Sequence, residues 1–161
     1  MSNLCVLPFT GIEADPMGNC KVCCLSTKTI PNINLKTNTL TEAFNSDYMY
    51  GLREEFLQGG KPEECIRCWA EEDAGLTSLR QFSEKWYPPV ADEFFMTFDN
   101  DIVENVPIYH LELRLGNFCN LKCIMCTEGS SSSVYAERVQ HKEIYSTVGI
   151  YPYNPRIQPW W

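Results

Sequence analysis

Three cysteines stand close together in the second half of the chain, at Cys119, Cys123 and Cys126. Their spacing, C-x3-C-x2-C, places three thiol groups on one short loop. Three thiolates hold three irons of a four-iron cluster, so the fourth iron keeps a position open to a substrate or cofactor. The spacing therefore indicates a site for chemistry and not a structural crosslink.

A zinc site is the alternative for these three cysteines. Structural zinc normally takes a fourth nitrogen or sulfur ligand nearby. The nearest histidines are His110, in an expected strand, and His141, in a polar stretch. Neither position is typical of a zinc ligand for this loop, so we favour a cluster.

The segments on both sides of the loop are expected to form regular structure. Residues 108–115 are apolar and alternate as a strand does, and the turn Gly116-Asn117 follows. After the loop, the serines at 130–133 are expected either to cap a helix that begins near Val134 and runs toward Ile144 or to form a flexible linker.

This order of strand, turn and C-x3-C-x2-C loop resembles the cluster loop of the radical S-adenosylmethionine (SAM) enzymes. The resemblance implies that the three loop cysteines bind a [4Fe-4S] cluster whose open iron chelates SAM. It also implies that the reduced cluster cleaves SAM to a 5'-deoxyadenosyl radical, and that Met125 contacts the SAM adenine through its backbone. Strand, loop and helix would then be the first βα unit of a partial barrel.

Charge and hydropathy exclude other classes of protein. Thirteen basic and 21 acidic residues give 13 − 21 = −8, which argues against a nucleic-acid partner. No apolar run approaches the ~20 residues that cross a membrane, and residues 1–4 do not resemble a signal peptide. We therefore expect a cytoplasmic protein without a membrane partner. In that reducing compartment, nine cysteines indicate metal or redox chemistry.

A second set of cysteines lies in the first half of the chain. Cys5, Gly18 and Cys23 fit C-x12-G-x4-C, and Cys65 and Cys68 add a C-x2-C. This pattern resembles the first half of the SPASM auxiliary domain, or the shorter Twitch domain, of radical SAM enzymes. The resemblance implies an auxiliary [4Fe-4S] cluster, and four thiolates would suit it to electron transfer or structure.

Zinc is the alternative metal for this second set. Cys20 and Cys23 also form a C-x2-C, so Cys20, Cys23, Cys65 and Cys68 would make a four-cysteine zinc site. The intervening stretch of 65 − 23 − 1 = 41 residues is longer than the ~15 to 20 typical of such sites. We favour the cluster with Cys5, and keep Cys20 as the alternative ligand. Cys24 is expected to be a buried free thiol.

The first 86 residues should form a hairpin and two helices. Residues 4–9 and 21–25 are the expected strands. A helix is expected from Thr41 to a stop at Gly59-Gly60, and a second from Glu63 to Trp86. The second helix should carry the acidic run 71–73 on a solvated face and bury an apolar stripe of Trp69, Leu76, Leu79, Phe82 and Trp86.

These elements predict an α/β chain, α+β overall, in two parts. Residues 1–88 would be the Twitch/SPASM-like module, 89–106 a bridging segment and 107–161 the start of a truncated radical SAM core. A complete barrel needs upwards of ~200 residues, whereas 161 − 108 + 1 = 54 remain from the expected strand onward. We therefore expect an N-terminal fragment of a longer enzyme, inactive on its own.

The resemblance implies radical-based modification of a peptide or small molecule, which is oxidoreductase chemistry. It also implies a reductant such as flavodoxin or ferredoxin as a partner. A non-catalytic zinc-binding module and a ferredoxin-like electron-transfer module are the alternative functions. The substrate and the bond modified are not indicated by the sequence.

Overall fold

A computed structural model describes residues 3–86, 108–114 and 116–141. This part of the chain is mixed α+β and contains a three-stranded sheet in the order β2-β1-β3. That agrees with the expected fold class at this level. In chain order the elements are α1 (Leu7–Thr10), β1 (Gly11–Ala14), β2 (Cys20–Lys21), α2 (Leu40–Phe44), α3 (Asp47–Leu57), the 3-10 helix η1 (Glu63–Cys65), α4 (Ile66–Asp73), α5 (Leu79–Trp86), β3 (His110–Leu113) and α7 (Ser132–Gln140).

A hairpin is present around the predicted turn, but its strands are β1 and β2, so only Lys21 of the strand expected at residues 21–25 lies in a strand. The two strands pair antiparallel, with Ala14 opposite Cys20. The turn between them is held by Asp15, whose Oδ1 accepts the Asn19 amide at 2.9 Å, and it contains Gly18 at φ 85°. The strand expected at residues 4–9 is wrong, because α1 occupies its second half. Pro8 in the first turn of α1 favours this, since its ring fixes a helical φ.

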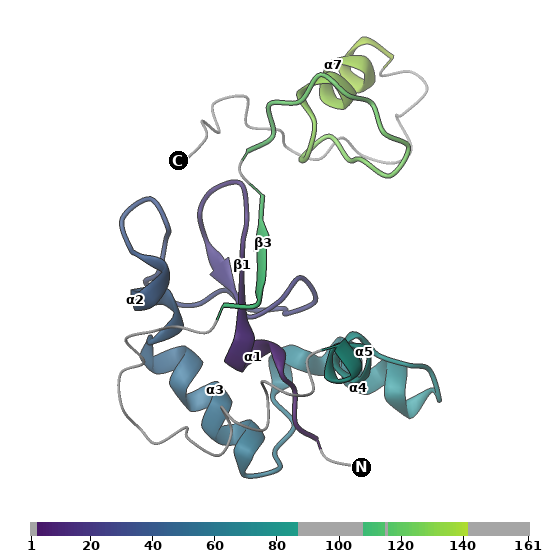
Figure 1. Ribbon diagram of the computed structural model, residues 1–161. Coiled ribbons are helices and arrows are strands. Elements are labelled where there is room, and N and C mark those ends of the chain that lie inside the picture. The colour runs from purple at the N-terminus through teal and green to yellow at the C-terminus, as the bar shows by residue number, and fades with distance from the viewer. Residues whose placement is uncertain (1–2, 87–107, 115, 142–161) are drawn as a thin grey trace.

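Strand β3 joins the hairpin from a distant part of the sequence. It pairs parallel with β1, from Gly11 opposite His110 to Ala14 opposite Leu113. A Cβ on Gly11 would lie 2.5 Å from the His110 carbonyl oxygen, so this close approach requires glycine. Figure 1 shows β1 and β3 side by side, with α2 and α3 to one side of them and α4 and α5 to the other.

The helix expected from Thr41 is two helices, α2 and α3. Thr39 caps α2 by accepting the Glu42 amide at 3.1 Å, and the Glu42 carboxylate accepts the Thr39 amide at 2.6 Å. Ser46 caps α3 and accepts the Met49 amide at 3.4 Å. Serine and threonine caps satisfy the free amides that begin a helix, so each starts a separate one. The predicted glycine stop is confirmed, with Gly59 at φ 78°.

The second expected helix is also divided, into η1, α4 and α5. Gly75, at φ 77°, ends the stretch after α4 and changes the direction of the chain. The predicted apolar stripe is therefore confirmed as a core contact only at Trp69 and Leu79 and is wrong at its other members. Trp69 is buried, but Leu76, Phe82 and Trp86 are 61%, 51% and 68% exposed.

The core of the described residues lies between α1, β1, α2 and α3. Arg53 is buried within it, donating from Nε to the Pro8 carbonyl at 2.7 Å and stacking on Phe44 at 3.8 Å from the ring centroid. The largest apolar side chains of the core are Phe9, Ile12, Phe44, Met49 and Phe56. Three cysteine side chains, Cys5, Cys20 and Cys23, pack in the same cluster. The core thus supports the segments that carry the N-terminal cysteines.

The cysteine loop and α7 follow β3 and lie beyond its C-terminal end (Figure 1). None of the helices in the described ranges is both long and apolar enough to cross a membrane.

Candidate metal centres

Four cysteines from three separate segments line one cavity. They are Cys5 before α1, Cys23 after β2, Cys65 at the end of η1 and Cys68 in the first turn of α4. All four are free thiols. Leu7 and Phe56 are among the apolar side chains that complete the lining. These are the four residues that the sequence assigned to the auxiliary site.

Local contacts explain how the segments meet. Cys65 is the residue before α4, so Cys65 and Cys68 lie one turn apart on the same side of the helix. The Thr27 amide donates to the Glu64 carbonyl at 3.1 Å, which ties the segment after Cys23 to η1. Trp69 is buried beside this junction and donates from Nε1 to the Pro62 carbonyl at 3.0 Å.

Burial favours the protonated form of three of these thiols, Cys5, Cys23 and Cys65, when no metal is bound. Burial raises the pKa of Cys23 to about 11 and that of Cys65 to about 12. Burial also raises the pKa of Cys5 well above its usual value, and negative charge on Cys23, Cys65 and Cys68 raises it further. A metal or cluster must displace their protons on binding, and its own positive charge would compensate the thiolates.

The metal ligands that this cavity offers are thiols, which bind both zinc and iron-sulfur clusters. Among the described residues, no group of three or more His, Cys, Asp or Glu side chains lies close enough together to hold one metal ion. A tetrahedral zinc site would bring every sulfur to about 2.3 Å from one point. Four cysteines line one cavity, and thiolates are the usual ligands of iron-sulfur clusters.

The two remaining N-terminal cysteines have other surroundings. Cys20 is fully buried in β2, and its Sγ contacts the Gly18 carbonyl at 3.8 Å. Burial raises the pKa of Cys20 to about 11. It is not among the residues that line the cavity. Cys24 was expected to be buried and is exposed instead.

The second candidate centre is the loop of Cys119, Cys123 and Cys126. Within it the Cys126 amide donates to the Cys123 carbonyl at 2.9 Å, and the Leu121 amide points at the Cys119 sulfur at 3.4 Å. Burial raises the pKa of Cys126, and the neighbouring Cys123 and Cys119 thiolates raise it further. The three thiols thus lie on one short loop, and Cys123 is the exposed one among them.

The serine run after the loop fixes its shape. Ser131 caps α7 by accepting the Val134 amide at 3.4 Å, so the capping prediction is confirmed. The Ser131 hydroxyl also donates to the Leu121 carbonyl at 2.8 Å. Ser132 accepts the Cys119 amide at 3.1 Å and donates to the Cys119 carbonyl at 2.9 Å. The sequence indicated the cap but not this second role, because the contacts span 10 to 13 residues.

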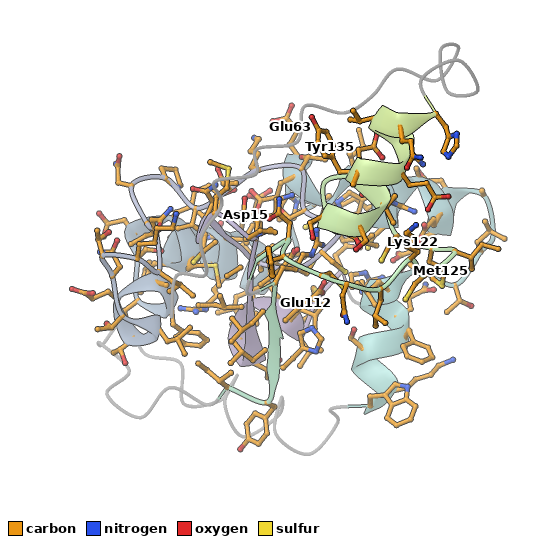
Figure 2. The ribbon with its side chains drawn as sticks, turned by 90° about the horizontal axis from the view of Figure 1, so that it is seen from above. Asp15, Glu63, Glu112, Lys122, Met125 and Tyr135 are labelled. Atoms are coloured by element: carbon orange, nitrogen blue, oxygen red, sulfur yellow. The ribbon has the colours of Figure 1, made fainter. Side chains whose placement is uncertain are left out.

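The outer side of the loop is apolar and exposed. Phe118, Ile124 and Met125 are 88%, 102% and 91% exposed. Figure 2 shows Met125 at the edge of the molecule, next to Lys122. Lys122 forms an ion pair with Glu137 of α7 at 2.7 Å, which is a further tie between loop and helix.

The remaining sequence-based assignments concern histidines and acidic residues. His110 begins β3, as expected, whereas His141, expected to be a solvated helix residue, is the half-buried residue that follows the end of α7. The acidic run was expected on a solvated face, but Glu72 is only 16% exposed and pairs with Arg80 at 2.7 Å. No sequence pattern indicated that pair, because Arg80 follows the chain reversal at Gly75.

Comparison with protein families, curated proteins and solved structures found no match to this chain.

Proposed function

We propose that this chain is an iron-sulfur protein of the radical SAM class with two clusters. Cys119, Cys123 and Cys126 would bind the SAM-cleaving [4Fe-4S] cluster, and an auxiliary [4Fe-4S] cluster would take its ligands from the four cysteines of the N-terminal cavity: Cys5, Cys23, Cys65 and Cys68. The observation that carries the proposal is the meeting of these four thiols at one cavity. They were selected because their spacing resembles the SPASM and Twitch pattern, and Cys5 and Cys68 are 68 − 5 = 63 positions apart in the sequence.

The two sites differ in the number of protein ligands, and this sets their roles. Four thiolates in a largely apolar cavity would close the coordination of an auxiliary cluster, which suits it to electron transfer. Three thiolates on an exposed loop would leave one iron open to SAM. When bound there, cluster and SAM together supply the radical chemistry.

The residues of the chain itself would bind and orient these groups. The hydroxyls of Ser131 and Ser132 hold the backbone at Leu121 and Cys119, so the loop keeps its curvature around the three thiols. The backbone of Met125 would face the SAM adenine, while its side chain is exposed. Positioning of this kind is what a protein contributes to cofactor chemistry.

The wider assignment follows from the same two sites. We propose residues 1–88 as the auxiliary module and β3, loop and α7 as the first βα unit of a radical SAM core. The chain would act within a longer enzyme that modifies a peptide or small molecule in the cytoplasm. A reductant such as flavodoxin or ferredoxin would supply the electron.

Metal analysis after anaerobic reconstitution tests the proposal. We expect about eight irons per chain, with matching sulfide. Changing Cys119, Cys123 and Cys126 together to Ala should halve the iron, and the control Cys24→Ser should leave it unchanged because that thiol lies outside both sets. Addition of SAM should alter the electron paramagnetic resonance (EPR) spectrum only when the loop cysteines are intact. A protein that binds zinc alone, or an unaltered iron content in the triple variant, would contradict it.

A further inference from the structure

Arg80 lies against the cavity of the four N-terminal cysteines. Its side chain is 3% exposed, and of the described residues that line the cavity it is the one with a cationic side chain. Burying a guanidinium is costly unless charge and hydrogen bonds compensate it. The buried guanidinium of Arg80 therefore needs a negatively charged partner and hydrogen-bond acceptors.

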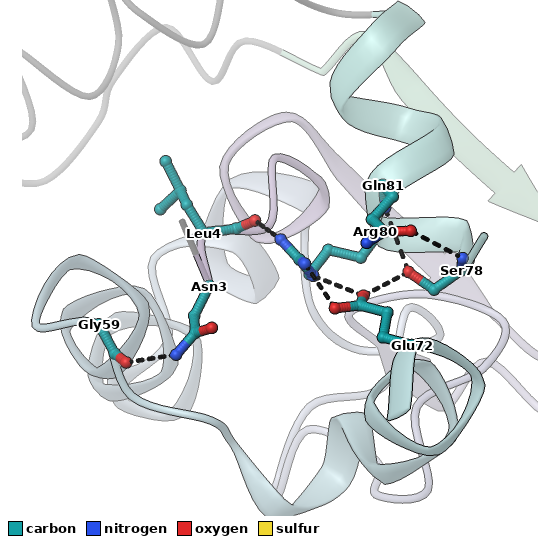
Figure 3. Close-up of polar contacts among 7 residues, drawn as sticks. All are labelled: Asn3, Leu4, Gly59, Glu72, Ser78, Arg80 and Gln81. Carbon is teal, nitrogen blue, oxygen red and sulfur yellow. Dashed lines mark hydrogen bonds and ion pairs between the residues drawn. The ribbon is translucent and has the colours of Figure 1, made fainter. Parts of the chain in front are cut away.

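Hydrogen bonds join Arg80 to both sides of the site (Figure 3). Its Nη1 donates to the Leu4 carbonyl at 2.7 Å, next to Cys5. Its Nε and Nη2 donate to the two carboxylate oxygens of Glu72 in α4 at 2.9 and 2.7 Å. The guanidinium also lies 5.1 Å from the centroid of the Trp69 ring, next to Cys68. Arg80 thus links the segment of Cys5 to the helix of Cys68.

The charges of the pair are not placed equally. Arg80 lines the cavity, whereas Glu72 does not and lies behind the guanidinium, where it also accepts the Ser78 hydroxyl at 2.5 Å. Burial lowers the pKa of Arg80, but the Glu72 carboxylate outweighs burial and raises it, so the cation persists. A negatively charged group bound in the cavity would therefore lie closer to the Arg80 guanidinium than to the Glu72 carboxylate.

We propose that Arg80 positions Cys5 against the Cys65–Cys68 helix and raises the reduction potential of the auxiliary cluster, and that Glu72 limits this rise. The inference rests on the proposed function. Reduction adds one electron, here supplied by dithionite, and therefore one negative charge to the site without breaking a bond. A desolvated cation nearby stabilises the more negative state, and a carboxylate behind it weakens that effect.

The test is the midpoint potential of the auxiliary cluster, followed by EPR in an anaerobic dithionite titration. The background is the chain with Cys119, Cys123 and Cys126 changed to Ala, so that one cluster gives the signal. Glu72→Gln should make the potential more positive. Arg80→Gln should make it more negative, with a change on the order of tenfold in the reduced-to-oxidised ratio at fixed potential, or about 59 mV for one electron.

Matched controls are available on the exposed side of α4, the helix that carries Glu72. Arg67 and Glu71 form an ion pair at 3.5 Å with side chains 65% and 30% exposed. Arg67→Gln and Glu71→Gln should leave the potential nearly unchanged, because water screens their charges. Arg80→Lys keeps the charge and loses the two-pronged contact with Glu72. A chelator should therefore remove iron from the Arg80→Lys variant faster than from the parent protein. The reduction potential of the cluster should change less in Arg80→Lys than in Arg80→Gln.

The potential is expected to rise in Glu72→Gln and to fall in Arg80→Gln. These opposite shifts distinguish an electrostatic role from a general loosening of the site, which would not depend on the sign of the charge removed. Loss of the cluster in Arg80→Gln, together with its retention in Arg80→Lys, would support the positioning role. A Glu72→Gln potential that moves negative, or no further than that of Glu71→Gln, would overturn the inference while the cluster itself stands. Absence of iron from the parent protein would instead refute the proposed function.

Discussion

Cys20 and Cys23 stand three positions apart, yet their sulfurs lie in different surroundings. Cys20 belongs to β2 and is paired with Ala14 across the hairpin, so its side chain enters the core. Cys23 lies beyond the end of the strand and turns to the cavity. The end of β2 thus separates two thiols that the sequence spacing alone left as competing ligands.

This difference predicts the result of single substitutions. Cys5→Ala should lower the iron content of the auxiliary site, because it removes a thiol from the cavity lining. Cys20→Ser should retain the iron and instead lower the free energy of unfolding, since it places a hydroxyl in the core. Iron analysis and urea denaturation measure the two effects. Loss of metal in Cys20→Ser with retention in Cys5→Ala would favour the zinc-like set of ligands.

At the scale of elements, the loop and α7 act as a unit. Ser132 forms two hydrogen bonds to the backbone of Cys119, one as acceptor and one as donor. Ser132→Ala should therefore increase the rate at which a chelator removes iron from the loop cluster. Ser130→Ala is the matched control, because Ser130 is exposed and its hydroxyl faces only that of Thr127 at 3.5 Å. Equal rates for the two variants would show that Ser132 does not hold the loop.

The start of α2 gives a second prediction for an element. Thr39 and Glu42 form a capping box, in which each side chain accepts the other's amide. Thr39→Ala should lower the free energy of unfolding by about 1 kcal/mol. Thr41→Ala should change it little, because Thr41 is an exposed residue inside α2. Urea denaturation measures the free energy of unfolding of both variants. A larger loss of stability in Thr41→Ala than in Thr39→Ala would indicate that Thr41, and not Thr39, caps the helix.

Over the whole molecule, the exposure of the loop would limit what SAM could contact if it bound to the proposed cluster. Ile124 and Met125 are almost fully exposed, so in the described residues few side chains stand over the open side of the loop. SAM bound through iron alone would be poorly positioned for cleavage. The reconstituted chain should therefore release little 5'-deoxyadenosine with SAM and dithionite, as chromatography would show. Multiple turnovers that disappear in Cys123→Ala would prove this wrong.

The sequence predicted which cysteines share a cavity better than it predicted where the helices are interrupted. Cys5, Cys23, Cys65 and Cys68 were identified because their spacing resembles the SPASM and Twitch pattern, and all four line one cavity. The division of both long helices was missed, because an apolar period continues through a Ser46 cap or a Gly75 reversal without interruption. Arg80 was missed because its partners are defined only after that reversal. Contacts made by tertiary packing leave little trace in local patterns.

The parallel pairing of β1 with β3 sets an order of events during synthesis. Gly11 faces His110 across 110 − 11 = 99 positions, so the sheet cannot close until most of the chain has left the ribosome. Closing a loop of that length costs entropy before any contact repays it, and such pairings form slowly. Until then β1 presents an unpaired edge on one side of the hairpin. An open sheet edge of this kind is a place where other chains can pair, so the late arrival of β3 also covers a site of association.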